Sequence, residues 1–287
     1  MKNITTVILA AGRSTRFISS KSKLTHELAG YPIISHVFDS AKKISENIIV
    51  VCNKDNYPEL KNILIGCKLV IQKNQKGTAD AIEVAKMHIK TENFIILFGD
   101  VPLITDKSLK KLIRSFKKNN TGSMIAFETH RPKGYGRVVL NNNKVTKVVE
   151  EINASHDEKL IEFCNSGIML VKKSIFYKNI KLIKFNKKKK ERYLTDIFEI
   201  YFKKNIPFSS VLSSEDEMSG VNNLTDFNKV DNLFQNRLVN KFLERGVLIK
   251  RPETSYFSYN VKIAKKVVIE PNVVIRNNVS IKSGSII

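Results

Sequence analysis

Near its start the chain reads Thr5-Thr6-Val7-Ile8-Leu9-Ala10-Ala11-Gly12-Arg13-Ser14-Thr15-Arg16. Residues 5–9 form a short β-rich run, as in a buried strand, and small and basic residues follow it at once. Small residues let a backbone approach a phosphate chain, which successive N–H groups can then hold. The stretch therefore predicts a strand that leads into a phosphate-binding loop, in which Arg16 and the later Lys23 neutralise charge.

The loop lacks two common nucleotide-binding fingerprints. Neither G-x-x-x-x-G-K-S/T nor G-x-G-x-x-G occurs in it, so neither a P-loop nor a dinucleotide-binding turn is expected. An ordinary surface turn with basic side chains fits the spacing of this loop equally well.

A second motif supplies a carboxylate, and it reads Phe98-Gly99-Asp100-Val101-Pro102-Leu103. Asp100 would stand at the carboxyl edge of a sheet, beside the first loop. A Mg²⁺ ion that bridges phosphates takes one or two such oxygens from the protein. Taken alone, Asp100 also fits a turn residue that bonds its own backbone, but next to the first motif the metal interpretation is favoured.

β-rich runs and helical patterns alternate around these motifs. Alternation at this pitch predicts a parallel sheet with helices on both faces and ligands at the carboxyl ends of the strands. Helical spacing in residues 78–89 puts Ala81, Val84, Ala85 and His88 on one face. The expected strands are residues 5–9, 47–52, 68–72 and 94–98, and the expected helices are residues 32–43, 78–89 and 107–116.

The middle of the chain predicts a different pattern. Residues 136–140 and 144–150 flank an Asn-rich turn and predict a hairpin. A strand at residues 163–171, a helix at 194–202 and a strand at 208–212 follow. A connecting helix is expected to begin at Thr225 and to end at Gly246, with one apolar face made by Phe227, Val230, Phe234 and Leu238.

The last part of the chain repeats every six residues. One series is Val261, Val267, Val273 and Val279, and a second is Ile263, Ile269, Ile275, Ile281 and Ile287. Two interleaved series of this period predict a short left-handed parallel β-helix, in which each hexapeptide makes one side of a triangular coil. A plain amphipathic strand is the alternative. In such a strand every second residue would be apolar, but here the third position that would face inward in each repeat is often polar or charged.

Composition restricts the class of protein. Hydrophobic residues make up 42% and charged residues 26% of the 287 residues, as in ordinary globular domains. No apolar run reaches the roughly 18 residues that span a bilayer, and the start lacks a signal-peptide core, so we expect a cytoplasmic protein. The cysteines, Cys52, Cys67 and Cys164, lie in or beside apolar stretches and are interpreted as structural thiols.

The net charge is +22. Its lysines are spread along the whole chain, and the densest run, residues 187–190, lies in a polar loop. We therefore expect the charge to attract anionic, phosphorylated substrates rather than nucleic acid.

The ordered motifs resemble a bacterial bifunctional family, N-acetylglucosamine-1-phosphate uridyltransferase/glucosamine-1-phosphate acetyltransferase. The resemblance is to the N-terminal uridyltransferase part and covers essentially the whole chain. The motifs are Leu9-Ala10-Ala11-Gly12-x-x-x-Arg16 with Lys23, Gln72-x-x-x-x-Gly77-Thr78, Phe98-Gly99-Asp100-Val101-Pro102-Leu103, Gly134-Tyr135-Gly136-Arg137, Asn165-x-Gly167, Tyr193-Leu194-Thr195-Asp196 and Gly220-Val221-Asn222-Asn223.

The resemblance implies a fold and a set of roles. A Rossmann-like nucleotidyltransferase domain would span residues 1–224, a linking helix 225–246 and the start of a left-handed β-helix 247–287. The implied partners are UTP, N-acetylglucosamine-1-phosphate and Mg²⁺, with trimers forming through the β-helix. The implied site residues are Arg16 and Lys23 (catalytic, on the UTP phosphates); Ala11, Gly12, Gln72, Gly77 and Thr78 (nucleotide); Asp100 and Asn222 (metal); and Gly136, Glu150, Asn165, Tyr193 and Thr195 (sugar phosphate).

Several alternatives stand beside these roles. Without the resemblance, Glu150 fits a solvated charge at a strand end and Asn165 a turn residue. Ser14 stands where the family usually has glycine, so the backbone there has less conformational freedom. Ser22 stands where the family usually has proline, so the turn there is not fixed in advance by a proline ring. A related enzyme for another sugar or nucleotide, or a non-catalytic remnant, also fits.

The resemblance implies uridylyl transfer by in-line attack of a phosphate oxygen, without a strong general base. No acetyl transfer is expected, because the hexapeptides cover fewer than two coils.

Overall fold

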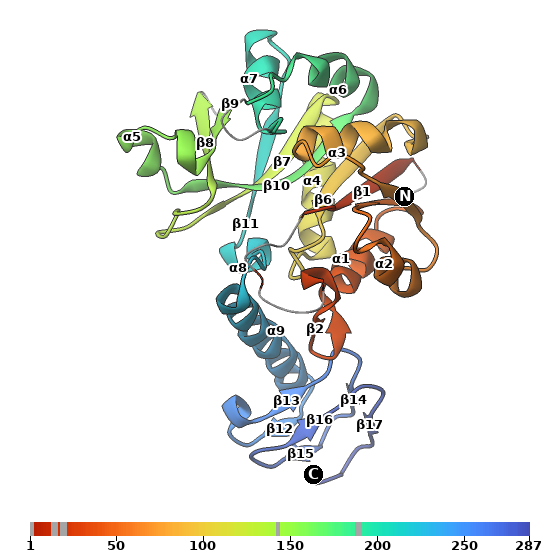
Figure 1. The fold of residues 1–287 in the computed structure, drawn as a ribbon. Helices are drawn as coiled ribbons and strands as arrows, with labels where there is room; N and C mark the ends of the chain where they lie inside the picture. The colour runs from red at the N-terminus through yellow and green to blue at the C-terminus, as the bar shows by residue number, and fades with distance from the viewer. Residues whose placement is uncertain (1–2, 13–16, 18–21, 142–143, 187–190) are drawn as a thin grey trace.

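A nine-stranded mixed sheet forms the centre of the protein in a computed structural model that describes residues 3–12, 17, 22–141, 144–186 and 191–287 (Figure 1). Its main path runs in the order β11-β7-β10-β6-β1-β4-β5, and the hairpin β8–β9 joins it through β10. The strands of this sheet are β1 (Ile4–Ala10), β4 (Asn47–Cys52), β5 (Lys68–Ile71), β6 (Asn93–Phe98), β7 (Gly122–Glu128), β8 (Gly136–Asn141), β9 (Lys144–Val149), β10 (Phe163–Lys172) and β11 (Ser209–Ser213).

The half of the sheet nearest the N-terminus is parallel, as the alternating pattern predicts. β1 lies between β4 and β6, with Val7 opposite Ile49 on one side and Ile96 on the other. β10 is antiparallel to both β6 and β7, which makes the whole sheet mixed. Every residue of β1 is buried, because helices cover both faces of a strand at the centre of such a sheet.

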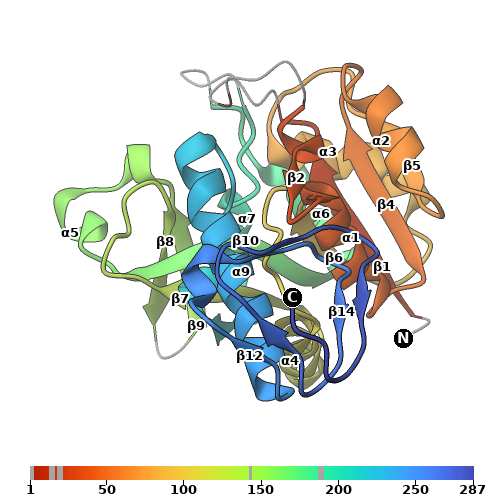
Figure 2. The same ribbon diagram turned by 90° about the horizontal axis from the view of Figure 1, so that it is seen from below.

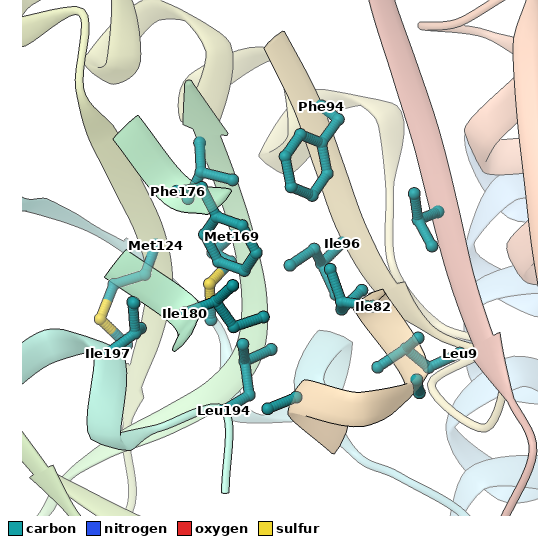
Figure 3. Packing of buried hydrophobic residues seen from close by; sticks show 14 of the residues in the cluster. Leu9, Ile82, Phe94, Ile96, Met124, Met169, Phe176, Ile180, Leu194 and Ile197 are labelled. Atoms are coloured by element: carbon teal, nitrogen blue, oxygen red, sulfur yellow. The ribbon is translucent and has the colours of Figure 1, made fainter. Parts of the chain in front are cut away.

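Helices pack on both faces of the sheet. The side chains of β1 therefore point alternately into two apolar cores, one on each face. Leu9 lies in the core that includes α3, α6 and α7, whose side chains appear in Figure 3. Ile8 lies in the core that includes α1 and α4, and so do the buried thiols of Cys52 and Cys164. The helices are α1 (Ile33–Lys42), α2 (Tyr57–Ile63), α3 (Thr78–Ala85), α4 (Asp106–Asn119), α5 (His156–Lys159), α6 (Lys173–Asn179), α7 (Asp196–Lys203), α8 (Glu215–Met218) and α9 (Leu224–Glu244).

In the described part of the chain, five 3₁₀ turns join these elements: η1 (Lys23–Thr25), η2 (Lys86–His88), η3 (Glu151–Asn153), η4 (Ile180–Leu182) and η5 (Pro252–Thr254). One of them corrects an expectation. α3 ends at Ala85 and passes into η2, so the predicted helix over residues 78–89 is shorter than expected. The tighter turn leaves His88 exposed and Ile89 buried, and the prediction that His88 shares the apolar face is wrong.

The predicted connecting helix is present as α9. Its N-cap residue Asn223 accepts a hydrogen bond from the Asp226 amide at 2.8 Å, and Gly246 follows the helix with φ +80°. Val230 packs at the N-terminal half of α9 and Leu238 at the C-terminal half, in two different apolar clusters. α9 therefore packs against residues of the α/β part, such as Leu103, at its N-terminal end and against the C-terminal strands at its other end (Figure 1).

The C-terminal residues form three parallel pairs of two-residue strands, which lie beside α9 when seen from below (Figure 2). They are β12 (Leu248–Ile249) with β15 (Val268–Ile269), β13 (Tyr256–Phe257) with β16 (Val274–Ile275), and β14 (Lys262–Ile263) with β17 (Ser280–Ile281). A positive φ recurs every six residues, at Lys266, Asn272, Asn278 and Gly284. The short hairpin β2 (Glu27–Leu28) and β3 (Tyr31–Pro32) contacts this region, because the Tyr259 amide donates to the Ala29 carbonyl at 2.8 Å.

Within the described ranges, no helix is both long enough and apolar enough to cross a membrane.

Candidate active site

Side-chain amides hold the backbone that leaves β1. The Nδ2 atom of Asn53 donates to the carbonyls of Ala11 at 3.3 Å and Gly12 at 3.4 Å. The Nδ2 atom of Asn56 donates to Ala10 at 2.8 Å, and the Nε2 atom of Gln75 donates to Ala11 at 2.7 Å. No described residue lies within 4 Å of where a Cβ on Gly12 would stand. The start of the predicted phosphate loop is thus fixed on one side and open beside Gly12.

The sequence reasoning did not identify these three amide side chains. Asn53 and Asn56 follow β4 directly, so they stand at the same carboxyl edge as the first loop. That pattern, two asparagines after a buried strand, was the available signal. Arg16 and Ser14 lie outside the described residues.

Lys23 and Asp100 meet at this edge. Lys23 lies in η1 and is 8% exposed, and its Nζ atom is 2.7 Å from Oδ2 of Asp100. Asp100 follows β6, the neighbour of β1, and the Gly99 amide donates to the Leu9 carbonyl at 2.9 Å. The structure therefore brings together the two motifs that the sequence analysis paired.

Asn222 is next to a residue that is hydrogen-bonded to the backbone of Asp100. The amide of Val221 donates to the backbone carbonyl of Asp100 at 2.8 Å. Asn222 follows directly, and its own amide donates to Oδ2 of Asp226 at 2.9 Å. One carboxylate and one amide oxygen fit a hard divalent cation that keeps several of its waters. Among the described residues, no group of three or more His, Cys, Asp or Glu side chains could form a complete protein cage.

The predicted nucleotide residues after β5 form one compact unit. Gln72 is 4% exposed, and its Nε2 atom donates to the Gly77 carbonyl and to Oδ2 of Asp80, each at 3.2 Å. Gly77 has φ +106°, and a Cβ there would stand 2.5 Å from the Arg192 carbonyl oxygen. Thr78 begins α3, and its hydroxyl accepts the Leu194 amide at 3.1 Å.

These contacts join the nucleotide residues to the predicted sugar residues. The Arg192 amide donates to the Lys76 carbonyl at 2.7 Å, and the Ala79 amide donates to the Arg192 carbonyl at 3.2 Å. Tyr193 and Thr195 follow Arg192 in the chain. The segments predicted to bind the base and the sugar phosphate therefore share one hydrogen-bonded backbone junction.

Glu150 is a partly buried carboxylate among the predicted sugar-phosphate residues. Its Oε1 atom accepts the Thr195 hydroxyl at 2.8 Å. Burial raises the pKa of Glu150 above its ordinary value, although the Thr195 hydrogen bond acts the other way and the nearby Glu191 charge adds to the rise. Burial, followed by the Glu150 charge, likewise raises the pKa of Asp196. Glu150 is therefore a partly exposed, hydrogen-bonded carboxylate rather than a freely solvated one.

Gly136 and Asn165 are cross-strand partners on β8 and β10. Oδ1 of Asn165 accepts the Gly167 amide at 2.8 Å, where the register of β10 against β7 shifts. Gly167 has φ +78°, and a Cβ there would come 2.4 Å from the Phe98 ring. Asn165 thus shapes a turn within the strand, as its alternative interpretation holds, and it also lies beside Gly136.

The fold and these motifs define a class of nucleotide-transferring proteins. The chain belongs to the family described as MobA-like NTP transferase domain, which matches residues 6–166. Within that class it belongs to the family of the bifunctional protein GlmU, to whose N-terminal part it corresponds. It is 35% identical to GlmU of Campylobacter fetus subsp. fetus over 300 residues, which cover 100% of this chain and 67% of that protein. It is 33% identical to GlmU of Bartonella quintana, with 100% of this chain and 65% of that protein covered.

Solved structures show the same fold at lower identity. A CMP:2-keto-3-deoxy-manno-octonic acid synthetase complexed with CTP superposes with a TM-score of 0.64 at 16% identity, covering 82% of this chain and 99% of that one. A putative glucose-1-phosphate thymidylyltransferase from Bacillus anthracis, in complex with a sucrose, also has a TM-score of 0.64, at 17% identity, covering 80% and 94%. The chain spans about two thirds of the length of the GlmU relatives.

Proposed function

We propose that this chain transfers a uridylyl group from UTP to N-acetylglucosamine-1-phosphate and releases pyrophosphate. The observation that carries the proposal is the contact of Lys23 with Asp100 at the carboxyl edge of the sheet. A cation and a metal-type ligand there stand where phosphates bind in open α/β folds. Membership of the GlmU family supports the choice of base and sugar.

The residues after β1, β5 and β6 would bind the nucleotide. The backbone at Ala11 and Gly12, with Arg16 and Lys23, would hold the triphosphate. Gln72 would pair with the uracil edge, since a glutamine amide offers both a donor and an acceptor. Gly77 and Thr78 shape that segment through their contacts with residues 192–194.

Asp100 and Asn222 would hold Mg²⁺, whose charge when bound would offset that of the phosphates. Asp100 would have to share its carboxylate with Lys23 or release it. Both side chains are hard oxygen donors, which Mg²⁺ prefers to nitrogen or sulfur.

The sugar phosphate would lie between β8, β10 and the start of α7. Gly136 offers a side-chain-free surface beside Asn165, where an added Cβ would press within 3.1 Å of Val148. Glu150 and Thr195 are already hydrogen-bonded to each other, and Tyr193 lies in the same segment. These polar groups would bind the hydroxyls of the sugar or the amide of its N-acetyl group.

The reaction needs little proton chemistry from the protein. An oxygen of the sugar 1-phosphate forms a new bond to the α-phosphorus of UTP, and the bond from that phosphorus to the bridging oxygen breaks. The electron pair leaves with pyrophosphate. Because the attacking phosphate is already anionic, Lys23 and Arg16 would act by orienting and neutralising the phosphates.

We extend the proposal to the C-terminal strands. The paired residues 262 and 280 lie 18 positions apart, which is three hexapeptides, and the same offset joins 256 to 274. This spacing supports one side per hexapeptide in a left-handed β-helix. Residues 1–224, 225–246 and 247–287 would then form the transferase domain, the linking helix and the β-helix start, with trimers assembling through the last.

A substrate panel tests the proposal. Pyrophosphate release is measured with N-acetylglucosamine-1-phosphate and UTP, CTP, dTTP or ATP, and then with UTP and glucosamine-1-phosphate or glucose-1-phosphate. The highest kcat/KM is expected for UTP with the N-acetylated sugar. A higher value for another pair would assign a related pyrophosphorylase activity, and no release with any pair would indicate a non-catalytic remnant.

A further inference from the structure

The hairpin β8–β9 contains a buried arginine that the proposed function does not use. Arg137 follows Gly136 in β8 and is 1% exposed. Among the described residues, it is the largest fully buried side chain. A buried cation is costly unless a charged partner and hydrogen bonds compensate it. Its partners therefore indicate what the fold holds in place here.

Glu151 is the charged partner. Nη2 of Arg137 lies 2.7 Å from Oε2 of Glu151 and donates to the Lys159 carbonyl at 3.4 Å, while Nη1 donates to the Tyr135 carbonyl. The same Oε2 atom of Glu151 accepts the Gly134 amide at 3.2 Å. The hydrogen bond from Arg137 holds the pKa of Glu151 below its usual range. One carboxylate thus ties the turn before β8 to the chain that leaves β9.

The position of this ion pair matters because of its neighbours. Glu150 and Glu151 are consecutive, yet Glu150 accepts from Thr195 whereas Glu151 faces Arg137. Gly136 immediately precedes Arg137 and pairs with Asn165. The ion pair therefore fixes the two backbone points that carry Gly136 and Glu150.

We propose that Arg137 and Glu151 are positioning residues that set the sugar-phosphate side of the site and leave the nucleotide side unaffected. The inference rests on the proposed function. On the nucleotide side, a different ion pair, Arg192 with Glu83, fastens the junction with α3. Among the described contacts, the Arg137 side chain bonds to Glu151, Lys159 and Tyr135, and none of these residues is among the proposed nucleotide residues. Through its backbone Arg137 pairs with Cys164 of β10, next to Asn165 on the proposed sugar-phosphate side.

The test compares KM for the two substrates in four variants. Arg137→Met removes the charge and the hydrogen bonds, Arg137→Lys keeps the charge, Glu151→Gln keeps an acceptor for Gly134, and the double variant combines Arg137→Met with Glu151→Gln. Glu162→Gln is the matched control, because Glu162 pairs with His130 on the surface, where their side chains are 52% and 94% exposed.

We expect Arg137→Met to raise KM for N-acetylglucosamine-1-phosphate by about tenfold or more, the scale at which small displacements affect catalysis. KM for UTP should stay within about twofold. Arg137→Lys should recover part of the loss, and the double variant should be less impaired than the product of the single effects, since the two side chains act as one unit. Hydrogen exchange should quicken in residues 134–151 and stay unchanged in residues 72–80.

Equal rises in both KM values, or unchanged KM values in a folded Arg137→Met protein, would overturn the inference. Arg137→Lys and Glu151→Gln decide the matter if the methionine variant does not fold. An inactive wild-type chain would remove the proposed function and this inference with it. An active wild type whose variants keep their sugar-phosphate KM would overturn the inference alone.

Discussion

The Nζ atom of Lys23 lies 2.7 Å from Oδ2 of Asp100, although the two residues are 77 positions apart in the chain. Lys23 is nearly buried, and the side chain of Asp100 is 25% exposed. The carboxylate therefore both neutralises a buried ammonium and offers the remaining oxygen to the site. A divalent cation bound to Asp100, as proposed above, would compete with Lys23 for the same negative charge.

Replacing Asp100 with alanine should cut turnover by at least about a hundredfold, the scale seen when a key electrostatic group is lost. The variant should also unfold at a lower temperature, because Lys23 loses its partner in a buried position. Pyrophosphate release and thermal unfolding are the measurements. Asp106→Asn is the control, since the exposed Asp106–Lys110 pair should contribute little. Near-normal turnover in Asp100→Ala would exclude Asp100 as a metal ligand.

Lys23→Ala should raise the UTP concentration needed for half-maximal rate, because a phosphate-facing cation is lost. Lys21 lies two positions away in the sequence and can partly substitute, so a variant lacking both lysines should show a larger effect. Initial rates over a UTP series provide the measurement. If the UTP dependence of both variants matched that of the wild type, Lys23 would serve only to neutralise Asp100.

Gly77→Ala should destabilise the fold more than Gly66→Ala. Both glycines have positive φ, at +106° and +84°, so each substitution carries a backbone cost of about 1–3 kcal/mol. Only at Gly77 would the new Cβ also meet backbone, at 2.5 Å from the Arg192 oxygen, whereas Gly66 has open space. Urea unfolding measures both free energies. Equal losses of unfolding free energy in the two variants would mean that the backbone at residues 77 and 192 can move apart at no cost.

The predicted sheet and the observed one agree where the pattern is local. Residues 48–52 and 94–98 are continuous apolar runs, and they lie in β4 and β6, which have nearly the expected bounds. β7 was not predicted, because it begins with Gly122 and Ser123 and its apolar run is short. The structure gives the reason for the glycine, since a Cβ at Gly122 would stand 2.2 Å from the Phe208 ring. That packing joins distant parts of the chain and leaves no local signal.

The candidate site shows the same division. Lys23 and Asp100 could be paired from sequence, because each follows a predicted neighbouring strand. Asn53 supports the first loop through bonds to Ala11 and Gly12, which lie about forty residues away, so its role becomes visible only in the fold. Arg137 belongs to the motif at residues 134–137, but its burial and its ion pair with Glu151 depend on the pairing of β8 with β9, which brings Glu151 back beside it.

The two neighbouring carboxylates at the end of β9 should respond to pH in opposite ways. Burial raises the pKa of Glu150, so its ionisation weakens the fold as pH rises from the unfolded-state pKa through the higher folded-state pKa. The unfolding free energy of Glu150→Gln minus that of the wild type should therefore increase over this rise.

The pKa of Glu151 is lowered, so its ionised form stabilises the fold above the unfolded-state pKa, and this contribution is lost as pH falls through the folded-state pKa. For Glu151→Gln the difference from the wild type should become more unfavourable as pH rises through that window. Urea unfolding at several acidic and neutral pH values tests both variants. If the stability difference from the wild type changed with pH in the same direction for both variants, the assigned environments of Glu150 and Glu151 would be contradicted.

The most direct test of the central claim is the ³¹P NMR spectrum of purified protein mixed with UTP, Mg²⁺ and N-acetylglucosamine-1-phosphate. The account predicts that the three UTP resonances and the sugar-phosphate resonance decline together, while signals of UDP-N-acetylglucosamine and pyrophosphate appear in equal amounts. A spectrum in which UTP and the sugar phosphate persist unchanged, with protein whose fold is intact, would contradict it.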